Sequence, residues 1–453
     1  MHCSFLTLSL LGSVSAALGA DVWTVNCGVL TIQRSDPIVS PGGPSSHVHA
    51  ISGGTAFSRN MPGINDAVNA KATTCDKYTD HSNYWCPQLY NRRDGMFELV
   101  PFTGANMYYK KFTCDYQAGG QWCPRPSGAR PFPPGLRMVA GNPFRRTQND
   151  SEQSNQAILY ETGGVGEMYG FPKVIQGRLQ MNVRFPSCWD GKNLDSPDHK
   201  SHMSYPDPTK GDTQGGMCPS THPIALLHIG AEFGFDTNAL NITDSSTLVF
   251  SMGDTTGYGG HADFIQGWED LAALGESFDN CNGFGDACAW NSFGTPDGKE
   301  GVKRDLDPEI PAVFEEEIGL NGPIAKLPGD NPVWDGVVSA LPKPTLSVLP
   351  SVVLPGPSTL VTLTTSRPVA ATLSISPVQT TPIPTLTSTS SSSSTSLAPL
   401  PTQEPSSSTS TSSSQSPSST STSTPTRKEQ YEKWMKWLQS LSDDVLDEIS
   451  EYI

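Results

Sequence analysis

The feature that most limits the fold of this chain is a tract of Ser, Thr and Pro that covers residues 341–426. Such a composition offers too little apolar surface to offset the conformational entropy that is lost on ordering. We therefore expect an extended, O-glycosylated and disordered linker there. A folded main domain is then confined to residues 21–340, which are numerous enough to bury a large core.

The N-terminus carries an apolar run, FLTLSLLGSVSAALGA, that ends in small residues. The run is too short to span a bilayer and is typical of a secretory signal peptide, so residues 1–20 are interpreted as a signal and the mature protein as secreted and extracellular. No other apolar run approaches about 18 residues, and no membrane span is expected. Asn149 and Asn241 lie in glycosylation acceptor sequences, which predicts a glycoprotein.

The net charge of −16 restricts the class of partner. An acidic surface repels the phosphate backbone, so nucleic acid is not expected as a partner. Uncharged glycans, such as a cell-wall polysaccharide, remain compatible with this surface.

Secretion also determines how the cysteines are interpreted, because thiols in an oxidising compartment mostly form disulfide bonds. Cys3 leaves with the signal peptide, and the nine cysteines that remain are an odd number, so one thiol is left over. Connectivity does not follow from sequence, but the spacing suggests four pairs. These pairs are Cys75 with Cys86, Cys114 with Cys123, Cys188 with Cys218, and Cys281 with Cys288.

Within the main domain, Gly, Pro, Asn and Asp interrupt the chain nearly every ten residues, and long helical periods are scarce. Residues 178–185, RLQMNVRF, alternate between apolar and polar as in a half-buried strand, and residues 223–233 and 246–252 are further strand-like runs. The clearest helical spacing lies in residues 263–281. We expect a mostly β domain, a sandwich or jelly roll, with long loops, a few helices and disulfide staples.

Residues 427–453 carry apolar side chains at helical spacing, among them Trp434, Leu438 and Val445. This pattern predicts an amphipathic helix or a short helical hairpin. A lone helix of this length is marginal in water, so we expect it to dock on a partner protein or on a glycan. Self-association and packing against the main domain remain open as alternatives.

Two histidines, His47 and His49, lie two residues apart in the Gly- and Ser-rich stretch SPGGPSSHVHAISGG. On an extended strand such residues point to the same side, so the two imidazoles could bind a single divalent metal ion. His261 or Asp263 would complete a mononuclear site for zinc, copper or iron. A proton relay, or simple hydrogen bonding within the loop, is the alternative.

Two further polar stretches are residues 186–206, PSCWDGKNLDSPDHKSHMSYP, and residues 252–263, MGDTTGYGGHAD. Functional groups are often carried on loops that a rigid scaffold positions. Without a metal, one carboxylate from each stretch could flank a glycosidic bond as acid and base. The competing interpretation is structural: aspartates that cap turns, and Asp263 as a helix N-cap.

The candidate residues form three sets according to their expected roles. The catalytic candidates are Asp198, His199, His202, His261 and Asp263. The metal ligands are His47 and His49. The substrate-binding candidates are Lys192 and four aromatic residues whose rings would stack on sugars: Tyr84, Trp85, Trp189 and Tyr258.

Several motifs follow one another in a characteristic order: SDPIVSPGGPSSHVH, GGTAF, SNYWCPQLY, PSCWDGKNLDSPDHKSHMSYP, THPIALL and GDTTGYGGHADFIQGW. Together they resemble a fungal secreted domain-of-unknown-function family, number nineteen ninety-six, which is often found beside WSC carbohydrate-binding modules. The resemblance covers about residues 24–290. It implies a secreted protein of filamentous fungi in glycan surroundings, and it transfers no catalytic residue. Cys86 departs from the usual pattern of this family.

Three hypotheses about function follow. The first is a secreted carbohydrate-active enzyme that cleaves a cell-wall polysaccharide as a hydrolase, a lyase or a metal-dependent enzyme. The second is a non-catalytic protein that binds a glycan or cell wall. The third is an interaction protein whose C-terminal helix docks a partner.

Overall fold

The computed structural model describes residues 22–120, 122–123, 127–148, 152–278, 314–334 and 336. Several predictions concern residues outside these ranges: the signal peptide (1–20), the linker (341–426), the C-terminal helix (427–453), the Cys281–Cys288 pair and the acceptor Asn149. They stay predictions.

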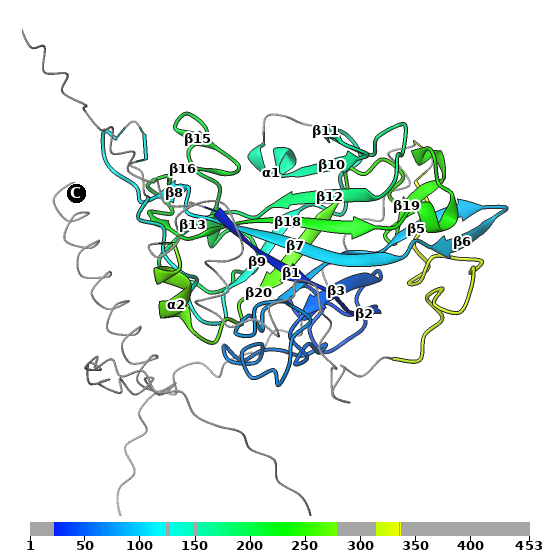
Figure 1. The fold of residues 1–453 in the computed structure, drawn as a ribbon, viewed down its shortest axis with the longest axis horizontal. Coiled ribbons are helices and arrows are strands. Elements are labelled where there is room, and N and C mark those ends of the chain that lie inside the picture. The colour runs from blue at the N-terminus through cyan, green and yellow to red at the C-terminus, as the bar shows by residue number, and fades with distance from the viewer. Residues whose placement is uncertain are drawn as a thin grey trace, which may run out of the picture. The chain divides into compact units, whose positions relative to one another are not determined.

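The largest element is an antiparallel sheet of six strands, whose long central strands lie side by side in Figure 1. Its order is β1 (Val22–Cys27), β7 (Phe102–Lys110), β18 (His228–Phe235), β12 (Leu179–Arg184), β10 (Ile158–Thr162) and β11 (Val165–Met168). The alternation in residues 178–185 predicted β12, because Leu179, Met181 and Val183 all point into the core.

The second sheet is antiparallel and has five strands. Its order is β2 (Val29–Gln33), β3 (His49–Gly53), β4 (Asn83–Pro87), β20 (His261–Ile265) and β9 (Arg137–Gly141). The two sheets pack face to face, since Tyr84 Oη on β4 lies 2.5 Å from Tyr109 Oη on β7. The main hydrophobic core fills the space between them.

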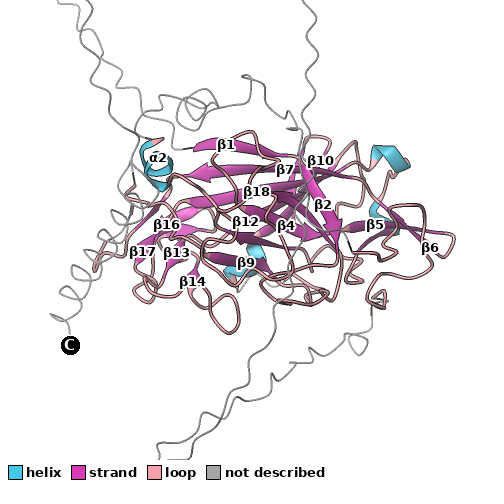
Figure 2. Cartoon of the chain, turned by 90° about the horizontal axis from the view of Figure 1, so that it is seen from below, coloured by secondary structure: helices cyan, strands magenta, loops and turns pink. Residues whose placement is uncertain are grey.

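Three small sheets and a few short helices complete the described part of the chain, and Figure 2 shows how little helix it contains. The small sheets are β14 (Met203–Ser204), β13 (Cys188–Trp189) and β17 (Ile224–Ala225); β15 (Gly211–Asp212), β16 (Gly215–Met217) and β8 (Thr113–Cys114); and β19 (Leu248–Phe250), β5 (Leu89–Arg93) and β6 (Met96–Leu99). The helices are α1 (Gln153–Gln156) and α2 (Leu271–Glu276), with 3₁₀ turns at Asn238–Leu240 and Ser245–Thr247. The prediction of a mostly β, disulfide-stapled fold is confirmed.

The helix predicted over residues 263–281 is wrong for its first part. Residues up to Ile265 belong to β20, and α2 begins only at Leu271, where the Asp270 side chain caps it. Both faces of β20 are buried, so its apolar residues occur without the strict alternation that marks a half-exposed strand. The apolar residues of the strand happen to continue the helical spacing of the apolar residues in α2. The spacing therefore predicted one helix across both elements.

Both faces of the five-stranded sheet are covered. Side chains such as Tyr84 and Phe264 point toward the six-stranded sheet. Their neighbours Ile51, Trp85 and Val139 point to the other side, where the loops that follow β2 and β3 bury them in a second hydrophobic cluster. This second side matters for function because His49, His261 and Asp263 also point to it.

Three disulfide bonds lie within the described residues: Cys27–Cys75, Cys114–Cys123 and Cys188–Cys218. The last two confirm predicted pairs, whereas the Cys75–Cys86 prediction is wrong. Cys75 instead bonds to Cys27 at the end of β1, and Cys86 is a free thiol buried in the core. Among the described residues, no helix combines the length and apolar character that a bilayer crossing requires.

Cys86 should be chemically inert in the native protein. Burial raises the pKa of its thiol, with Asp263 nearby adding to the rise, and the thiolate is the reactive form. Iodoacetamide should leave Cys86 unmodified in native protein and label it after unfolding in guanidinium chloride, as peptide mass spectrometry would show. Labelling of Cys86 at equal rates in both states would contradict the buried position.

Candidate metal centre

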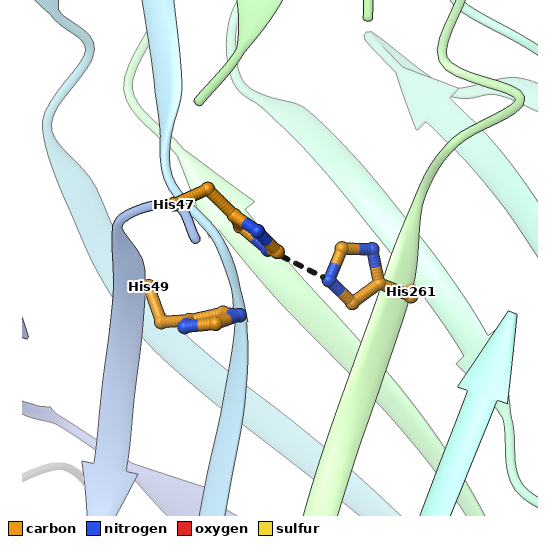
Figure 3. A group of neighbouring side chains, drawn as sticks. All are labelled: His47, His49 and His261. Carbon is orange, nitrogen blue, oxygen red and sulfur yellow. Dashed lines mark hydrogen bonds between the residues drawn. The ribbon is translucent and has the colours of Figure 1, made fainter. Parts of the chain in front are cut away.

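Three histidines from two distant parts of the chain meet on the outer side of the five-stranded sheet. His49 is the first residue of β3, His47 precedes it by two residues, and His261 is the first residue of β20. His47 Nε2 lies 3.0 Å from His261 Nε2, although the two residues are 214 apart in sequence. Figure 3 shows the three rings turned toward one another, and one nitrogen from each lies within 4.8 Å of the others.

The second nitrogen of each ring is held by a nearby group. His49 Nδ1 donates to the Ser35 carbonyl at 3.0 Å, and His261 Nδ1 donates to the Gly259 carbonyl at 3.0 Å. His47 Nδ1 lies 2.9 Å from the Ser46 hydroxyl, which can donate or accept. The two carbonyls fix the tautomers of His49 and His261, so the lone pair of each ring lies on Nε2. Metal-binding histidines are oriented in this way by their outer partners.

The site is buried, with only 6% of His47, 0% of His49 and 4% of His261 exposed. Burial lowers the pKa of His49 to about 3 and that of His261 to about 4, and it lowers the pKa of His47 as well. All three imidazoles are therefore neutral at neutral pH, which is the form that ligates metal ions.

Two buried carboxyl groups adjoin the histidines. Asp36, Asp263 and His49 also each place one donor atom within 4.8 Å of the others, so His49 belongs to both sets. Burial raises the pKa of both Asp36 and Asp263, and the closeness of the two carboxyls adds to the rise for Asp263. Their oxygens could accept or release a proton beside the histidines.

Several buried polar atoms on this side of the sheet have no hydrogen-bond partner among the described residues. They are Gln33 Oε1, His49 Nε2, Trp85 Nε1 and Asp263 Oδ2. Gln33 pairs with His49 across β2 and β3, and Trp85 pairs with Asp263 across β4 and β20. Two of these four atoms, His49 Nε2 and Asp263 Oδ2, belong to the donor sets themselves and are therefore available to an ion.

The 186–206 loop reaches this site through two residues. Lys200 Nζ donates to the carbonyl of Gly141, which pairs with His261 across β9 and β20. His199 Nδ1 lies 2.9 Å from the Asp195 carboxylate, and this bond raises the pKa of His199. His199 is half-exposed and lies within electrostatic range of Asp36. All three polar stretches of the sequence therefore meet at one place.

Two of the catalytic candidates have structural roles. Asp198 accepts hydrogen bonds from the backbone and side chain of Ser201 and from Ser196; although partial burial opposes them, these bonds lower the pKa of Asp198. His202 is buried, with Nε2 on the Arg137 carbonyl and Nδ1 beside the Ser196 hydroxyl. Both residues hold the loop in shape, and both ring nitrogens of His202 are engaged.

The substrate-binding prediction is wrong for three aromatic residues. Tyr84 and Trp85 are 0% exposed and Trp189 is 3% exposed, so their rings cannot stack on a sugar. Alternate residues of β4 point to opposite faces, and both faces of that sheet are covered, which places Tyr84 and Trp85 in different clusters. Lys192 is exposed and Tyr258 is half-buried, so both remain accessible.

Two aspartates of residues 252–263 have structurally defined positions. Asp254 accepts from Thr256 and from the Gly259 backbone, so it shapes the loop that presents His261. Asp263 lies within β20 and is no helix cap. Cys27, Cys75 and Asp80 also lie close together, but the two cysteines form a disulfide and offer no thiolate to a metal.

Asp36 was missed by sequence reasoning. It lies in SDPIVSP, where an aspartate before a proline is typical of a turn, and its carboxylate does accept the backbone amides of Ile38 and Val39. No spacing connects it to Asp263, because sheet pairing alone brings the two segments together.

Comparison with known proteins gives one match. The sequence model of a family described as Domain of unknown function (DUF1996) matches residues 36–268, just over half of the chain and a range that contains all five donor residues. No curated protein and no solved structure matches the chain.

Proposed function

The chain belongs to the family described as Domain of unknown function (DUF1996), and from this premise we propose that it is a secreted, metal-dependent enzyme that cleaves a polysaccharide. The observation that carries the proposal is the convergence of His47, His49 and His261. Three neutral imidazoles leave at least one coordination position open, as in catalytic rather than structural sites. Zinc, copper and iron all accept such ligands. The bound ion would supply Lewis acidity at this position.

The protein groups around the ion supply the acid–base functions. His199 is held by Asp195, has a raised pKa and is accessible to solvent, which suits a general acid that protonates the oxygen of a leaving sugar. The backbone of His199 has φ of 56°, a conformation that non-glycine residues seldom adopt. Such strain is concentrated at functional sites, which supports this role.

Polysaccharide is proposed as the substrate because the other features of the chain are consistent with it. The disulfide bonds and the absence of a membrane-crossing helix among the described residues are compatible with secretion. The net charge of −16 disfavours polyanions such as nucleic acids. A Ser-, Thr- and Pro-rich linker would allow the main domain to reach many positions on the surface of an insoluble cell wall.

The test compares metal-loaded and chelator-stripped protein on a panel of plant and fungal cell-wall polysaccharides, with released oligosaccharides measured by mass spectrometry. We expect products only from the loaded protein. His199→Asn should lower the rate by about 10² to 10⁴, the usual contribution of a general acid, while the metal content stays unchanged. Asparagine is chosen because it tolerates a positive φ.

The matched control is Lys326→Ala, an exposed change outside the three polar stretches that should keep full activity. The absence of products from every polysaccharide with loaded protein would overturn the enzymatic proposal. Full activity of His199→Asn would instead reject His199 as the acid and leave the metal centre in place.

A further inference from the structure

The outer face of the six-stranded sheet has an unusual composition. In the three central strands, the residues between the buried ones point away from the core. They are Asn106, Tyr108 and Lys110 on β7, His228, Gly230, Glu232 and Gly234 on β18, and Gln180, Asn182 and Arg184 on β12. This face lies on the opposite side of the sandwich from the histidine cluster, because the core separates the two sheets.

Local propensity does not explain these residues. Asparagine and glycine are depleted in strands, and an outward-facing strand position is usually occupied by a β-branched or aromatic residue. Glycine within a strand often marks a place where a ligand approaches the backbone closely. Local rules are broken most often at functional sites, which favours binding as the reason.

Hydrogen bonds hold the polar side chains in a fixed array across the strands. Asn106 Nδ2 and Tyr108 Oη each donate to Glu232 Oε2 at 3.3 Å. Asn182 Oδ1 accepts from Gln180 Nε2 at 2.9 Å, and Asn182 Nδ2 donates to Glu167 at 3.0 Å. The array leaves Asn106 Oδ1 buried without a partner in the described part of the chain. Such preorganised groups lose little entropy when they bind.

Several charged groups on this face have partners. Arg184 pairs with Glu167 at 2.5 Å, Lys110 Nζ donates to Gln214 at 2.9 Å, and Glu232, whose pKa burial raises, accepts from Asn106 and Tyr108. Amide and hydroxyl groups beside charges that already have partners are complementary to an uncharged, hydroxyl-rich ligand rather than to an ion. An apolar protein partner is also disfavoured, because the face offers few apolar side chains.

Gly230 leaves a strand position beside the tyrosine without a side chain. It pairs with Tyr108 across β18 and β7. The atoms nearest to a Cβ built at Gly230 are the flexible end of Lys110, at 3.3 Å, and the His228 ring, at 3.7 Å. A ligand could reach this position if the Lys110 side chain moved aside.

We propose that this face binds one chain of an uncharged polysaccharide, which lies across β7, β18 and β12 with a sugar ring stacked on Tyr108. Amide groups of Asn106, Gln180 and Asn182 would bond to its hydroxyls. The site is independent of the metal centre and would hold substrate or wall near the enzyme even when no metal is bound.

The test uses the full chain, stripped of metal, in affinity electrophoresis through laminarin and hydroxyethyl cellulose, two soluble uncharged glucans. We expect wild type to be retarded by at least one of them and not by polygalacturonate. Tyr108→Ala and Gly230→Thr should each weaken the retardation about tenfold, because one removes the stacking ring and the other blocks its neighbour.

Gly230→Thr separates binding from folding. Threonine favours strands, and the nearest atoms to the new Cβ belong to the flexible end of Lys110, so the variant should unfold at the wild-type urea concentration or above. Gly166→Thr on the edge strand β11, where a Cβ meets nothing within 4 Å, and Tyr116→Ala are matched controls that should bind as wild type. Wild-type retardation of Gly230→Thr, or no retardation of wild type by either glucan, would overturn the proposal.

Discussion

Replacing His261 with alanine should lower the affinity of the protein for Zn²⁺ and for Cu²⁺ by more than about 100-fold. Loss of an outer hydrogen-bond partner of a ligand already costs about 10- to 100-fold, and here a ligand itself is removed. His49→Ala should have an equal or larger effect, because the lone pair on His49 Nε2 has no other partner among the described residues and its Nδ1 is fixed by Ser35. Competition with a chromogenic chelator measures the affinity directly.

The tautomer of His47 follows from its neighbours. His47 Nε2 lies 3.0 Å from His261 Nε2, whose ring donates through Nδ1 to Gly259, so His47 must be the donor between them. To ligate an ion through Nε2, His47 would carry its lone pair there and its proton on Nδ1, facing the Ser46 hydroxyl. Every ring stays neutral in this exchange.

A buried histidine outside the cluster is the appropriate control. His228 is 0% exposed and neither of its ring nitrogens has a partner within the described chain, yet it belongs to neither donor set. His228→Ala should therefore keep wild-type metal affinity. Equal affinities in wild type, His261→Ala and His49→Ala would reject the cluster as a metal site, whatever the enzymatic assays give.

Metal binding should also raise the melting temperature, because an ion that binds only the folded chain stabilises it in proportion to the logarithm of its concentration over Kd. This increase should vanish in His261→Ala and persist in His228→Ala. Since the apo forms of all variants can be compared in the same experiment, a folding defect is distinguished from a lost ligand.

The sequence predicted the fold class and part of the site for identifiable reasons. Alternation in residues 178–185 predicted β12 because one side of that strand lies in the core and the other does not. The spacing of His47 and His49 predicted a shared site, and the structure brings His261 to the pair. Both predictions rest on the spacing of residues within one short segment, and such spacing can be recognised in a single sequence.

The errors arose where tertiary packing, rather than local sequence, determines the structure. β4 and β20 are buried on both sides, so Tyr84 and Trp85 became core residues and residues 263–265 gave no strand signal. Cys75 bonded to a cysteine 48 residues away rather than to the nearer Cys86. Asp36 joined Asp263 only through strand pairing. The spacing of residues along the sequence does not indicate which distant segments pair. These contacts are seen only in the folded sheets.

The buried carboxyl of Asp80 should make the protein lose stability as the pH rises from about 4 to about 7. Burial raises the pKa of Asp80 to about 7, despite hydrogen bonds from the Ser82 amide at 3.0 Å and the Tyr84 hydroxyl at 2.8 Å. In the unfolded chain the group titrates near 3.9. Between these values the folded state binds more protons than the unfolded state, so the free energy of unfolding falls with rising pH.

The size of this effect follows from the shift. A difference of about three pKa units corresponds to about 4 kcal/mol, which is present below pH 4 and lost as the pH rises through 7. Asp80→Asn should abolish this dependence, because an amide mimics the neutral acid: its oxygen accepts from Ser82, and its nitrogen donates to Tyr84. Tyr84 can then donate to Tyr109, which also accepts from Trp268 Nε1 at 2.8 Å.

Urea unfolding of wild type and Asp80→Asn at pH 4, 5, 6 and 7 isolates this group, because other buried acids such as Glu232 contribute equally to both proteins. The variant should gain about 3 to 4 kcal/mol on wild type between pH 4 and pH 7. A constant difference across the range would show that the pKa of Asp80 is the same in the folded and the unfolded state, so that Asp80 is ionised in the folded state at pH 5 to 7. Tyr84, which contacts Tyr109 between the two sheets, would then donate its hydrogen bond to an ionised carboxylate of Asp80 rather than to a neutral acid.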